Sequence, residues 1–380
     1  MSKYGRYNIK LCALVLLVVS TICAINILVD PFGIWNLWNN KSVACKSEQE
    51  THERLCRAIA IINIKPSIIF IGSSRTRIGL DPGYYAQIYP ETIYNTGVSS
   101  VTMDEMLWYF KHALQNQPKL KEIIVGIDFY GFNRNFPNGE DFPSQQMGKT
   151  HITYKSFLET AASLDALKST LLTVKNNWGM PAPSFFEPNG KTSDPAIQNI
   201  YGKIVDIEGF TMINRFNINT KEHYANYELS PERIDEFREL VTICREKGIE
   251  CKVFISPSHA TDMEAIRVAG KWQEFENMKR QLCAITPILD LSGYNSITTD
   301  PIGSERRYYW DGSHYKKEIG NMILDQLIGI RGNSPADFGV MITPDNIEEH
   351  LIFIRQAREK WVKDNPDIVN YVQLLKKTQT

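Results

Sequence analysis

An uncharged stretch of nineteen residues, Leu11–Val29, limits what this chain can be more than any other feature of its sequence. Since an α-helix rises about 1.5 Å per residue, this stretch is long enough to cross a hydrocarbon core about 30 Å thick. It follows three basic residues, Lys3, Arg6 and Lys10, and it ends before the first acidic residue, Asp30. Because basic residues are retained on the cytoplasmic side, the pattern predicts a signal anchor with a cytoplasmic N-terminus.

A cleaved signal peptide is the alternative interpretation of the same stretch. The apolar region of such a peptide usually spans about 7 to 15 residues before a small-x-small cleavage site, and the sequence TICAIN does not match that site. We therefore expect residues 1–30 to form an uncleaved, single-pass anchor in the cell (inner) membrane. No later stretch is long and apolar enough to cross again, so the rest of the chain is expected to form a periplasmic or extracytoplasmic body.

The charges of the chain are balanced. Lys and Arg together number 42, Asp and Glu number 43, and the net charge is −1, so no bulk attraction to a nucleic acid is present. With 43% hydrophobic and 22% charged residues, the composition is typical of a folded protein and not of a disordered or multi-span one.

Five of the seven cysteines lie beyond the anchor, on the side where disulfides form. They are Cys45, Cys56, Cys244, Cys251 and Cys283. Cys45 could close a short loop with Cys56, and Cys244 could pair with Cys251 or with Cys283; alternatively, all are small buried side chains. The sequence contains no C-x-x-C or H-E-x-x-H pattern, so we expect no metal site and no cofactor.

Short apolar runs in the exported part alternate with amphipathic stretches, which is the pattern of a parallel sheet with crossover helices. The expected strands are residues 65–72, 91–97, 121–128, 251–256 and 286–293. The expected helices are residues 104–116, 230–248, 262–282 and 315–330. This order predicts an α/β fold in which a mostly parallel, doubly wound sheet is the middle layer of a three-layer α/β/α sandwich.

The domain boundaries follow from where this alternation begins and stops. Residues 31–64 are expected to be a juxtamembrane segment, and residues 65–330 the main domain. Residues 133–225 interrupt the alternation with Pro, Gly, Asn and aromatic residues, and they predict an insertion over the strand ends with helices near 154–175. Residues 331–380 are expected to be a helical tail. Four apolar residues of the tail share one helical face and should pack on the domain: Ile347, Leu351, Ile354 and Trp361.

Polar residues cluster directly after the predicted strands. They are Ser73, Ser74 and Arg75 after the first strand, Asn95 and Gly97 after the second, Asp128 after the third, His259 after the fourth, and Asp311 and His314 after the fifth. Because the carboxyl ends of parallel strands meet at one edge of a sheet, these groups should line one crevice. A serine hydroxyl becomes nucleophilic when an imidazole accepts its proton and a carboxylate orients that imidazole, so the set predicts acyl transfer.

Two of these segments carry a family resemblance. The block GSSRT at residues 72–76 and the block DGSH at residues 311–314, with a glycine and a polar residue after the strands between them, resemble the ordered motifs of the GDSL/SGNH hydrolase superfamily. The resemblance implies that Ser74 is the nucleophile and that Asp311 and His314 complete the triad. It also implies an SGNH-like fold over about residues 65–330.

The anchor, together with G-S-S in place of G-D-S, narrows the resemblance to one branch of that superfamily. The chain looks like the membrane-anchored exported members, which include the D-alanyl transfer protein of teichoic acid modification and periplasmic polysaccharide O-acetyltransferases. This branch implies a separate multi-span membrane acyltransferase as partner.

Two positions depart from the family pattern. The family carries an oxyanion-binding asparagine where this chain has Asp128, and an ionised carboxylate only accepts hydrogen bonds. We expect Asp128 to pair with Arg75 or Arg77, which leaves the oxyanion to the backbone N–H groups of Ser74 and Gly97, with Asn95 or Asn133 as further candidates; a protonated Asp128 is the alternative. Ser73 occupies the family's aspartate position and is the fallback nucleophile.

Three further features have an open interpretation. His259 is either a second base or substrate ligand, or a helix cap. Arg75 and Arg77 either hold an anionic substrate group or neutralise Asp128. The run Tyr308–Trp310 either stacks on sugar faces or packs in the core.

We therefore expect a membrane-anchored esterase or O-acyltransferase that acts on an ester-linked acyl group, in our interpretation acetyl, of a cell-envelope glycan or lipid-linked saccharide. The rival interpretation is a catalytically inactive scaffold or glycan-binding subunit of an envelope polysaccharide biosynthesis complex, and the Asp128 departure favours it.

Overall fold

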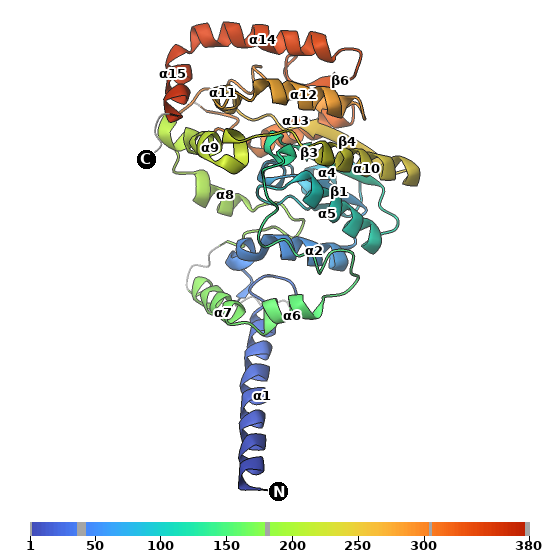
Figure 1. Ribbon diagram of the computed structural model, residues 1–380, viewed down its shortest axis with the longest axis vertical. Helices are drawn as coiled ribbons and strands as arrows, with labels where there is room; N and C mark the ends of the chain where they lie inside the picture. Colours follow the sequence, from blue (N-terminus) through green and yellow to red (C-terminus); the bar gives the residue numbers. More distant parts are fainter. Residues whose placement is uncertain (1, 36–42, 179–182, 304–305, 377–380) are drawn as a thin grey trace.

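A computed structural model describes residues 2–35, 43–178, 183–303 and 306–376. It begins with the helix α1, Lys3–Val29, which is 27 residues long, mostly exposed, and apolar enough to cross a membrane. Figure 1 shows α1 extending alone from one end of the molecule, with the N-terminus at its tip. The helix ends where Asp30 adopts a left-handed conformation with a φ of 52°.

The body of the protein contains a six-stranded sheet in the order β2-β1-β3-β4-β5-β6. The strands are β1 (Ile68–Ile71), β2 (Ile93–Asn95), β3 (Glu122–Ile127), β4 (Glu250–Ile255), β5 (Ile288–Asp290) and β6 (Val340–Ile342). The first five are the strands expected from the sequence, and they pair in parallel. The antiparallel edge strand β6 was not expected, because its three residues come from the predicted helical tail.

Each face of the sheet is covered by its own apolar cluster, because side chains alternate along a strand. Ile69, Ile123 and Val253 belong to a cluster shared with α5 (Met103–Asn116), α10 (Pro231–Lys247) and α12 (Trp272–Cys283). Ile68 and Ile124 belong to a second cluster shared with α4 (Pro82–Tyr85) and α13 (Lys317–Leu327). The two clusters hold the strand ends, and the loops that follow them, in fixed positions.

Local sequence explains where α10 begins and ends. The Ser230 hydroxyl accepts a hydrogen bond from the Arg233 N–H at 3.3 Å, and Pro231 occupies the first turn. Gly248 ends the helix with a φ of 66°, a conformation that glycine adopts without strain. Both boundaries agree with the expected helix over residues 230–248.

Two expected helices differ from the structure. The single helix expected over residues 262–282 is two helices, α11 (Ala260–Val268) and α12, and the break falls at Gly270, whose φ is 79°. The closing helix begins at Lys317 and not at Tyr315, because Tyr315 forms a β-bridge with Tyr309. The positive φ of Gly270 and the bridge from Tyr315 back to Tyr309 both override the local helical pattern.

The juxtamembrane segment and the tail are both part of the folded body. The helix α2 (Glu53–Ile64) buries Ala58 and Ile61 in the same cluster as β1 and β3. The tail forms α14 (Ile347–Asp364) and α15 (Pro366–Leu375), and it buries Ile347, Leu351 and Ile354 in that cluster as expected. Figure 1 shows α14 at the end of the body farthest from α1.

The insertion has two parts with different neighbours. The helices α6 (Tyr154–Ala161) and α7 (Leu164–Asn176) flank the C-terminal end of α1, whereas α8 (Asp194–Tyr201) and α9 (Ile207–Asn219) lie beside the body (Figure 1). Shorter turns complete the described chain: η2 (Ser47–His52), α3 (Ser74–Gly79), η3 (Phe129–Phe132) and the π-helical turn η4 (Lys221–Ala225). Asn214 of α9 contacts Asp262, which follows β4, so the second part of the insertion reaches the strand ends.

All seven cysteines are free thiols in the structure. Cys56 contacts the carbonyl oxygens of Phe32 and Gln49, at 3.6 and 3.8 Å from its Sγ. Cys251 contacts Cys244, and this contact together with burial raises the pKa of the Cys251 thiol well above its ordinary value. The disulfide pairings remain predictions.

Candidate active site

The proposed nucleophile lies in a tight turn between β1 and α3. Ser73 is fully buried, and its hydroxyl caps α3 by accepting a hydrogen bond from the Arg75 N–H at 3.1 Å. Ser74 is the first residue of α3 and is partly exposed. The turn requires a glycine at position 72, because a Cβ there would lie 2.2 Å from the Thr76 hydroxyl. The turn therefore leaves the Ser74 side chain partly exposed, whereas the Ser73 side chain is buried as the cap of α3.

The structure brings Ser74, His314 and Asp311 into one hydrogen-bonded series. The Ser74 Oγ lies 2.9 Å from the His314 Nε2, and the His314 Nδ1 lies 3.0 Å from each carboxylate oxygen of Asp311. The first contact joins residues 240 positions apart in the chain. A hydroxyl, an imidazole and a carboxylate in this order form the arrangement that activates a serine for acyl transfer.

The Asp311 carboxylate is held in its ionised form. Burial would raise its pKa, but the neighbouring His314 and hydrogen bonds from the backbone N–H groups of Ser313 and His314 more than offset that effect. Those two N–H groups lie 2.8 and 2.7 Å from the Asp311 Oδ1. The net result is a lowered pKa, so Asp311 stays charged and can stabilise an imidazolium at His314.

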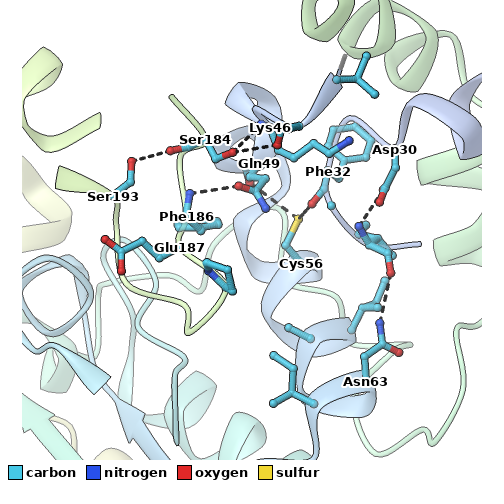
Figure 2. Close-up of a pocket in the computed structure, with 18 of the residues that line it drawn as sticks. Asp30, Phe32, Lys46, Gln49, Cys56, Asn63, Ser184, Phe186, Glu187 and Ser193 are labelled. Carbon is cyan, nitrogen blue, oxygen red and sulfur yellow. Dashed lines mark hydrogen bonds between the residues drawn. The ribbon is translucent and has the colours of Figure 1, made fainter. Parts of the chain in front are cut away.

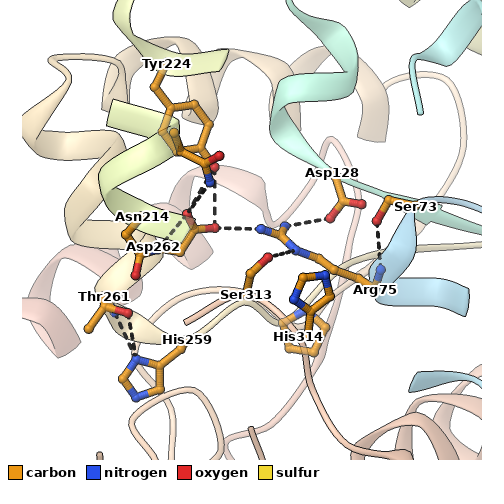
Figure 3. A network of polar contacts seen from close by, with 12 residues as sticks. Ser73, Arg75, Asp128, Asn214, Tyr224, His259, Thr261, Asp262, Ser313 and His314 are labelled. Atoms are coloured by element: carbon orange, nitrogen blue, oxygen red, sulfur yellow. Dashed lines mark hydrogen bonds and ion pairs between the residues drawn. The ribbon is translucent and has the colours of Figure 1, made fainter. Parts of the chain in front are cut away.

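Arg75 links the turn that carries Ser74 (residues 72–74, the nucleophile turn) to the loop that carries His314 (residues 311–314, the histidine loop). Its Nε donates to the Ser313 Oγ at 2.9 Å, its Nη1 contacts the Asp128 Oδ1 at 2.7 Å, and its Nη2 contacts the Asp262 Oδ2 at 2.9 Å. Figure 3 shows this guanidinium between the two carboxylates, with His314 beside it. Since Arg75 follows Ser74 and Ser313 precedes His314, the guanidinium fixes the spacing between nucleophile and base.

The charge of Arg75 is secured by the same partners. Burial alone would lower its pKa, but Asp128 and Asp262 raise it well above the ordinary value. Arg75 is almost completely buried, so it acts within the protein and not as an exposed anion ligand. The sequence left two roles open for Arg75, which were to hold an anionic substrate group or to neutralise Asp128. The structure places Arg75 against Asp128.

Asp128 pairs with Arg75, one of the two arginines expected from the sequence. One of its oxygens binds Arg75, and the other, Oδ2, is buried with no hydrogen-bond partner among the described residues. An ionised carboxylate beside a guanidinium offers no proton to donate. Arg77 does not take part, because it pairs with Glu53 of α2 and donates to the Ser99 hydroxyl at 3.2 Å.

Gly97 and Asn95, two expected oxyanion ligands, bind each other instead. The Gly97 N–H donates to the Asn95 Oδ1 at 3.0 Å, and the Asn95 Nδ2 donates to the carbonyl oxygens of Thr76 and Leu80 at 2.9 and 3.1 Å. Gly97 packs so closely on α3 that a Cβ would lie 2.8 Å from the Ser73 carbonyl oxygen. These residues brace the nucleophile turn, and the expectation that their N–H groups face an oxyanion is corrected.

Asn133, the other candidate donor, is also engaged by the protein. Its Nδ2 donates to the His223 carbonyl oxygen at 3.0 Å, and its Oδ1 accepts from the N–H of Glu228 at 2.9 Å. The Ser74 N–H, at the start of α3, has no acceptor within the described part of the chain. This backbone group is therefore the donor that remains for an oxyanion at the Ser74 hydroxyl.

His259 is a helix cap. Its Nδ1 accepts a hydrogen bond from the Thr261 N–H at 3.2 Å at the start of α11, and its Nε2 lies 2.8 Å from the Asp300 carbonyl oxygen. Burial lowers its pKa to about 4, so the imidazole is neutral near pH 7. Both ring nitrogens are occupied, and the role of second base or substrate ligand is not supported by this geometry.

The aromatic run beside the histidine loop divides between core and surface. Tyr309 is fully buried and donates to the Pro257 carbonyl oxygen at 2.6 Å. Trp310 is partly exposed and lines a pocket of about 400 Å³ together with Ile78, Gln198 and Lys316. No triad residue lines this pocket, but Trp310 directly precedes Asp311 and Ile78 lies one turn after Ser74 in α3.

Three site residues were missed by sequence reasoning: Asp262, Ser313 and Tyr224. Asp262 binds Arg75 and also contacts the Tyr224 hydroxyl at 3.2 Å. Asp262 could have been noticed, because it closely follows the fourth strand. Tyr224 comes from the insertion, where no pattern marked it.

Another cavity lies elsewhere, at the end of α1. It measures about 790 Å³, and its wall includes Asp30, Lys46 and Glu187. Figure 2 shows how hydrogen bonds fix its wall: the Ser184 hydroxyl accepts from the Lys46 N–H at 2.8 Å, and the Gln49 side chain accepts from the Phe186 N–H at 3.1 Å. Neither Ser74 nor His314 lines this cavity.

The described residues contain no cluster of His, Cys, Asp and Glu that could hold a metal ion. A scan of the chain against protein-family models finds no match, and a search of curated proteins finds no relative either.

Proposed function

We propose that this protein is a membrane-anchored serine esterase or O-acyltransferase with an SGNH-like α/β/α domain. Its substrate would carry an ester-linked acyl group, in our proposal acetyl, on a cell-envelope glycan or a lipid-linked saccharide. The observation that supports this most strongly is the continuous series from the Ser74 hydroxyl through His314 to Asp311. The placement is inferred from α1 and its basic flank: a cytoplasmic N-terminus and a body outside the cytoplasm.

The geometry suggests the following steps. His314 Nε2 accepts the Ser74 proton while Ser74 Oγ attacks the acyl carbonyl carbon, and the Ser74 N–H faces the developing oxyanion. The ester bond then breaks, the leaving alcohol takes the proton from His314, and the acyl group stays on Ser74. A water molecule or a sugar hydroxyl then gives its proton to His314 and attacks the acyl carbon. The bond between this carbon and the Ser74 Oγ breaks, and His314 returns the proton to the Oγ.

The pocket lined by Trp310, the residue before Asp311, is suited to a saccharide acceptor or donor. Trp310 offers an aromatic face, and Gln198 and Lys316 offer hydrogen-bonding groups around it. An acyl donor that arrives through the membrane would need a separate multi-span acyltransferase as partner, because this chain offers a single candidate span among its described residues.

A second candidate function is a catalytically inactive scaffold or glycan-binding subunit of an envelope polysaccharide complex. The pairing of Asp128 with Arg75 favours it, and so does the Gly97 N–H bound to Asn95, because together they remove two family-type oxyanion donors. One backbone donor would remain, and loss of a single oxyanion donor reduces turnover about 10²- to 10³-fold in enzymes of this type.

A direct test uses the full chain in detergent micelles, a fluorophosphonate serine probe and 4-nitrophenyl acetate. The esterase proposal expects covalent labelling that is lost in Ser74→Ala, with a fall in turnover of about 10³-fold or more. Ser73→Ala is the matched control and should retain labelling. A folded wild-type chain that is not labelled and does not hydrolyse the ester would overturn the enzyme proposal. The scaffold or glycan-binding subunit would then be the remaining candidate.

A further inference from the structure

We propose that the α6–α7 hairpin is a second membrane contact: the outward face of α7 docks on the lipid bilayer that surrounds α1. The inference takes α1 as the membrane-crossing helix of the proposed function, and it does not depend on the chemistry at Ser74. Figure 1 shows α6 and α7 on either side of the end of α1, at the base of the folded body.

The two faces of α7 have different compositions. The inward face carries small residues, among them Ala166, Ser169 and Thr170, which are buried. The outward face forms a stripe at helical spacing: Leu164, Lys168, Leu171, Lys175 and, just beyond the helix, Trp178. Leu164, Leu171 and Trp178 are 77%, 64% and 85% exposed, which is unusual for such large apolar side chains.

The depth of the hairpin follows from its bonds to α1. The Asn26 Nδ2 donates to the Ala161 carbonyl oxygen at 2.9 Å, and the Asn26 Oδ1 accepts from the Thr170 hydroxyl at 2.8 Å. Asn26 lies sixteen residues beyond Lys10, the last basic residue before the apolar stretch, and this separation corresponds to about 24 Å of helix. The hydrocarbon core is about 30 Å thick, so Asn26 and the residues it binds lie at its far boundary.

Asn26 itself gives a second reason to place lipid here. It is completely buried within a helix whose membrane-spanning window is otherwise exposed. An amide in hydrocarbon needs its hydrogen bonds satisfied by protein, and Ala161 and Thr170 satisfy them. The hairpin therefore packs against the apolar part of α1, at a level where its outer surface meets lipid.

The charges on the hairpin suit an anionic lipid surface. Lys168 and Lys175 flank the leucines of the outward face, whereas Asp165, the acidic residue of α7, turns to the His52 ring at 3.5 Å. On α6, Tyr154 is 77% exposed. Leucine, lysine and tryptophan along one helical face, as on α7, are the residues of an interfacial helix, with apolar groups in the acyl boundary and ammonium groups at the headgroups.

A bilayer fits this face better than a protein partner does, because lipid must already surround α1 at the same level. The body cannot lift away from that surface while Asn26 stays bonded to both helices of the hairpin. The docked face would hold the body at one height and tilt, and thereby set the distance between the membrane and the triad.

Fluorescence quenching tests the contact. The full chain is reconstituted in vesicles of acyl-brominated phosphatidylcholine and anionic phosphatidylglycerol, and its tryptophan emission is compared with that in unbrominated vesicles. Trp178→Phe should lower the quenched fraction by at least a third. Trp108→Phe is the matched control, because Trp108 is 49% exposed on α5, away from α1, and its removal should not lower that fraction.

A second variant tests the outward face of α7 itself, and not only the tryptophan that reports on it. Leu164→Glu with Leu171→Glu should reduce the quenched fraction of the tryptophan emission at least twofold, while the circular dichroism spectrum and the thermal unfolding midpoint stay at the wild-type values and report that the body is folded. Equal quenching in the wild type and Trp178→Phe, or unchanged quenching in the double variant, would overturn the proposal; a protein that covers this face only in native membranes would give that result. Failure of the anchor is seen separately, as release of the chain from vesicles at alkaline pH.

Discussion

The protein contains two carboxylate–imidazole pairs near the carboxyl ends of the strands, Asp311–His314 and Asp290–His350, and the two pairs have different neighbours. In the Asp311–His314 pair, the second imidazole nitrogen contacts the partly exposed Ser74 hydroxyl at 2.9 Å. In the other pair, the His350 Nε2 contacts the Asp290 Oδ2 at 2.9 Å, and the fully buried Lys279 contacts the same oxygen at 2.7 Å.

The difference teaches that a carboxylate and an imidazole do not make a catalytic pair by themselves. Lys279 already neutralises Asp290, and the His350 imidazole has no serine partner among the described residues. That cluster joins α12, β5 and α14, so its contribution is to stability. Within the part of the chain that the structure describes, His314 is the one residue that forms an ion-pair contact with the Asp311 carboxylate, which leaves this carboxylate able to stabilise a charge that forms on the imidazole.

The largest expected effect is a difference in ester turnover between variants of Asp311 and of Asp290. Asp311→Asn should lower ester turnover by about 10⁴-fold with little change in stability, because it removes the group that orients His314 and stabilises the imidazolium. Asp290→Asn should leave turnover per folded molecule unchanged and lower the free energy of unfolding. Steady-state kinetics and denaturant unfolding of both variants measure this, and equal loss of activity in both would remove the distinction.

The next effect concerns stability alone. Lys279→Met should lower the free energy of unfolding by about 3–5 kcal/mol, because it leaves the buried Asp290 charge without its ammonium partner, with only His350 and Ser292 as hydrogen-bond partners among the described residues. The double variant Lys279→Met with Asp290→Leu should recover much of that loss, since no unpaired charge remains. A single variant as stable as the wild type in urea unfolding would show that the ion pair contributes little.

A third effect is the pH dependence of stability. Burial would raise the pKa of Asp290, but Lys279 and His350 lower it below its ordinary value. A depressed folded-state pKa stabilises the protein fully above the unfolded value of about 3.9, and this stabilisation is lost as the pH falls below that value toward the folded-state pKa. The free energy of unfolding, measured from pH 6 to pH 3, should therefore fall more steeply in the wild type than in Asp290→Asn. Parallel curves would contradict the assignment.

The smallest effect compares the two adjacent serines. Ser73→Ala removes the cap of α3 and should cost about 1 kcal/mol of stability. Its turnover should stay within tenfold of the wild type, because Ser74 and His314 keep their contact. A loss of turnover as large as that of Ser74→Ala would move the nucleophile to Ser73.

Much of the fold and of the proposed triad was accessible from sequence, for local reasons. The β-branched runs predicted β1 to β5, and residues after strand ends share an edge, so Ser74, Asp311 and His314 could be grouped before any coordinates. The bond between Gly97 and Asn95 joins residues two positions apart and is a local turn of the kind that asparagine forms. The close approach of α3 to Gly97 could not be predicted, because it depends on how the loop after β2 packs against the Ser73 carbonyl group. The link from Arg75 to Asp262 likewise joins residues 187 positions apart.

The amino-acid sequence by itself determined the apolar helix at the N-terminus, the alternation of strands and helices, and the small set of groups at the strand ends. These depend on hydropathy and spacing over a few residues. Only the tertiary structure decided that Asp128 faces a guanidinium, that His259 caps a helix, and that the hairpin α6–α7 packs on α1. The physical reason is that hydrogen bonds and ion pairs depend on distances of about 3 Å between chain-distant atoms, and packing sets those distances.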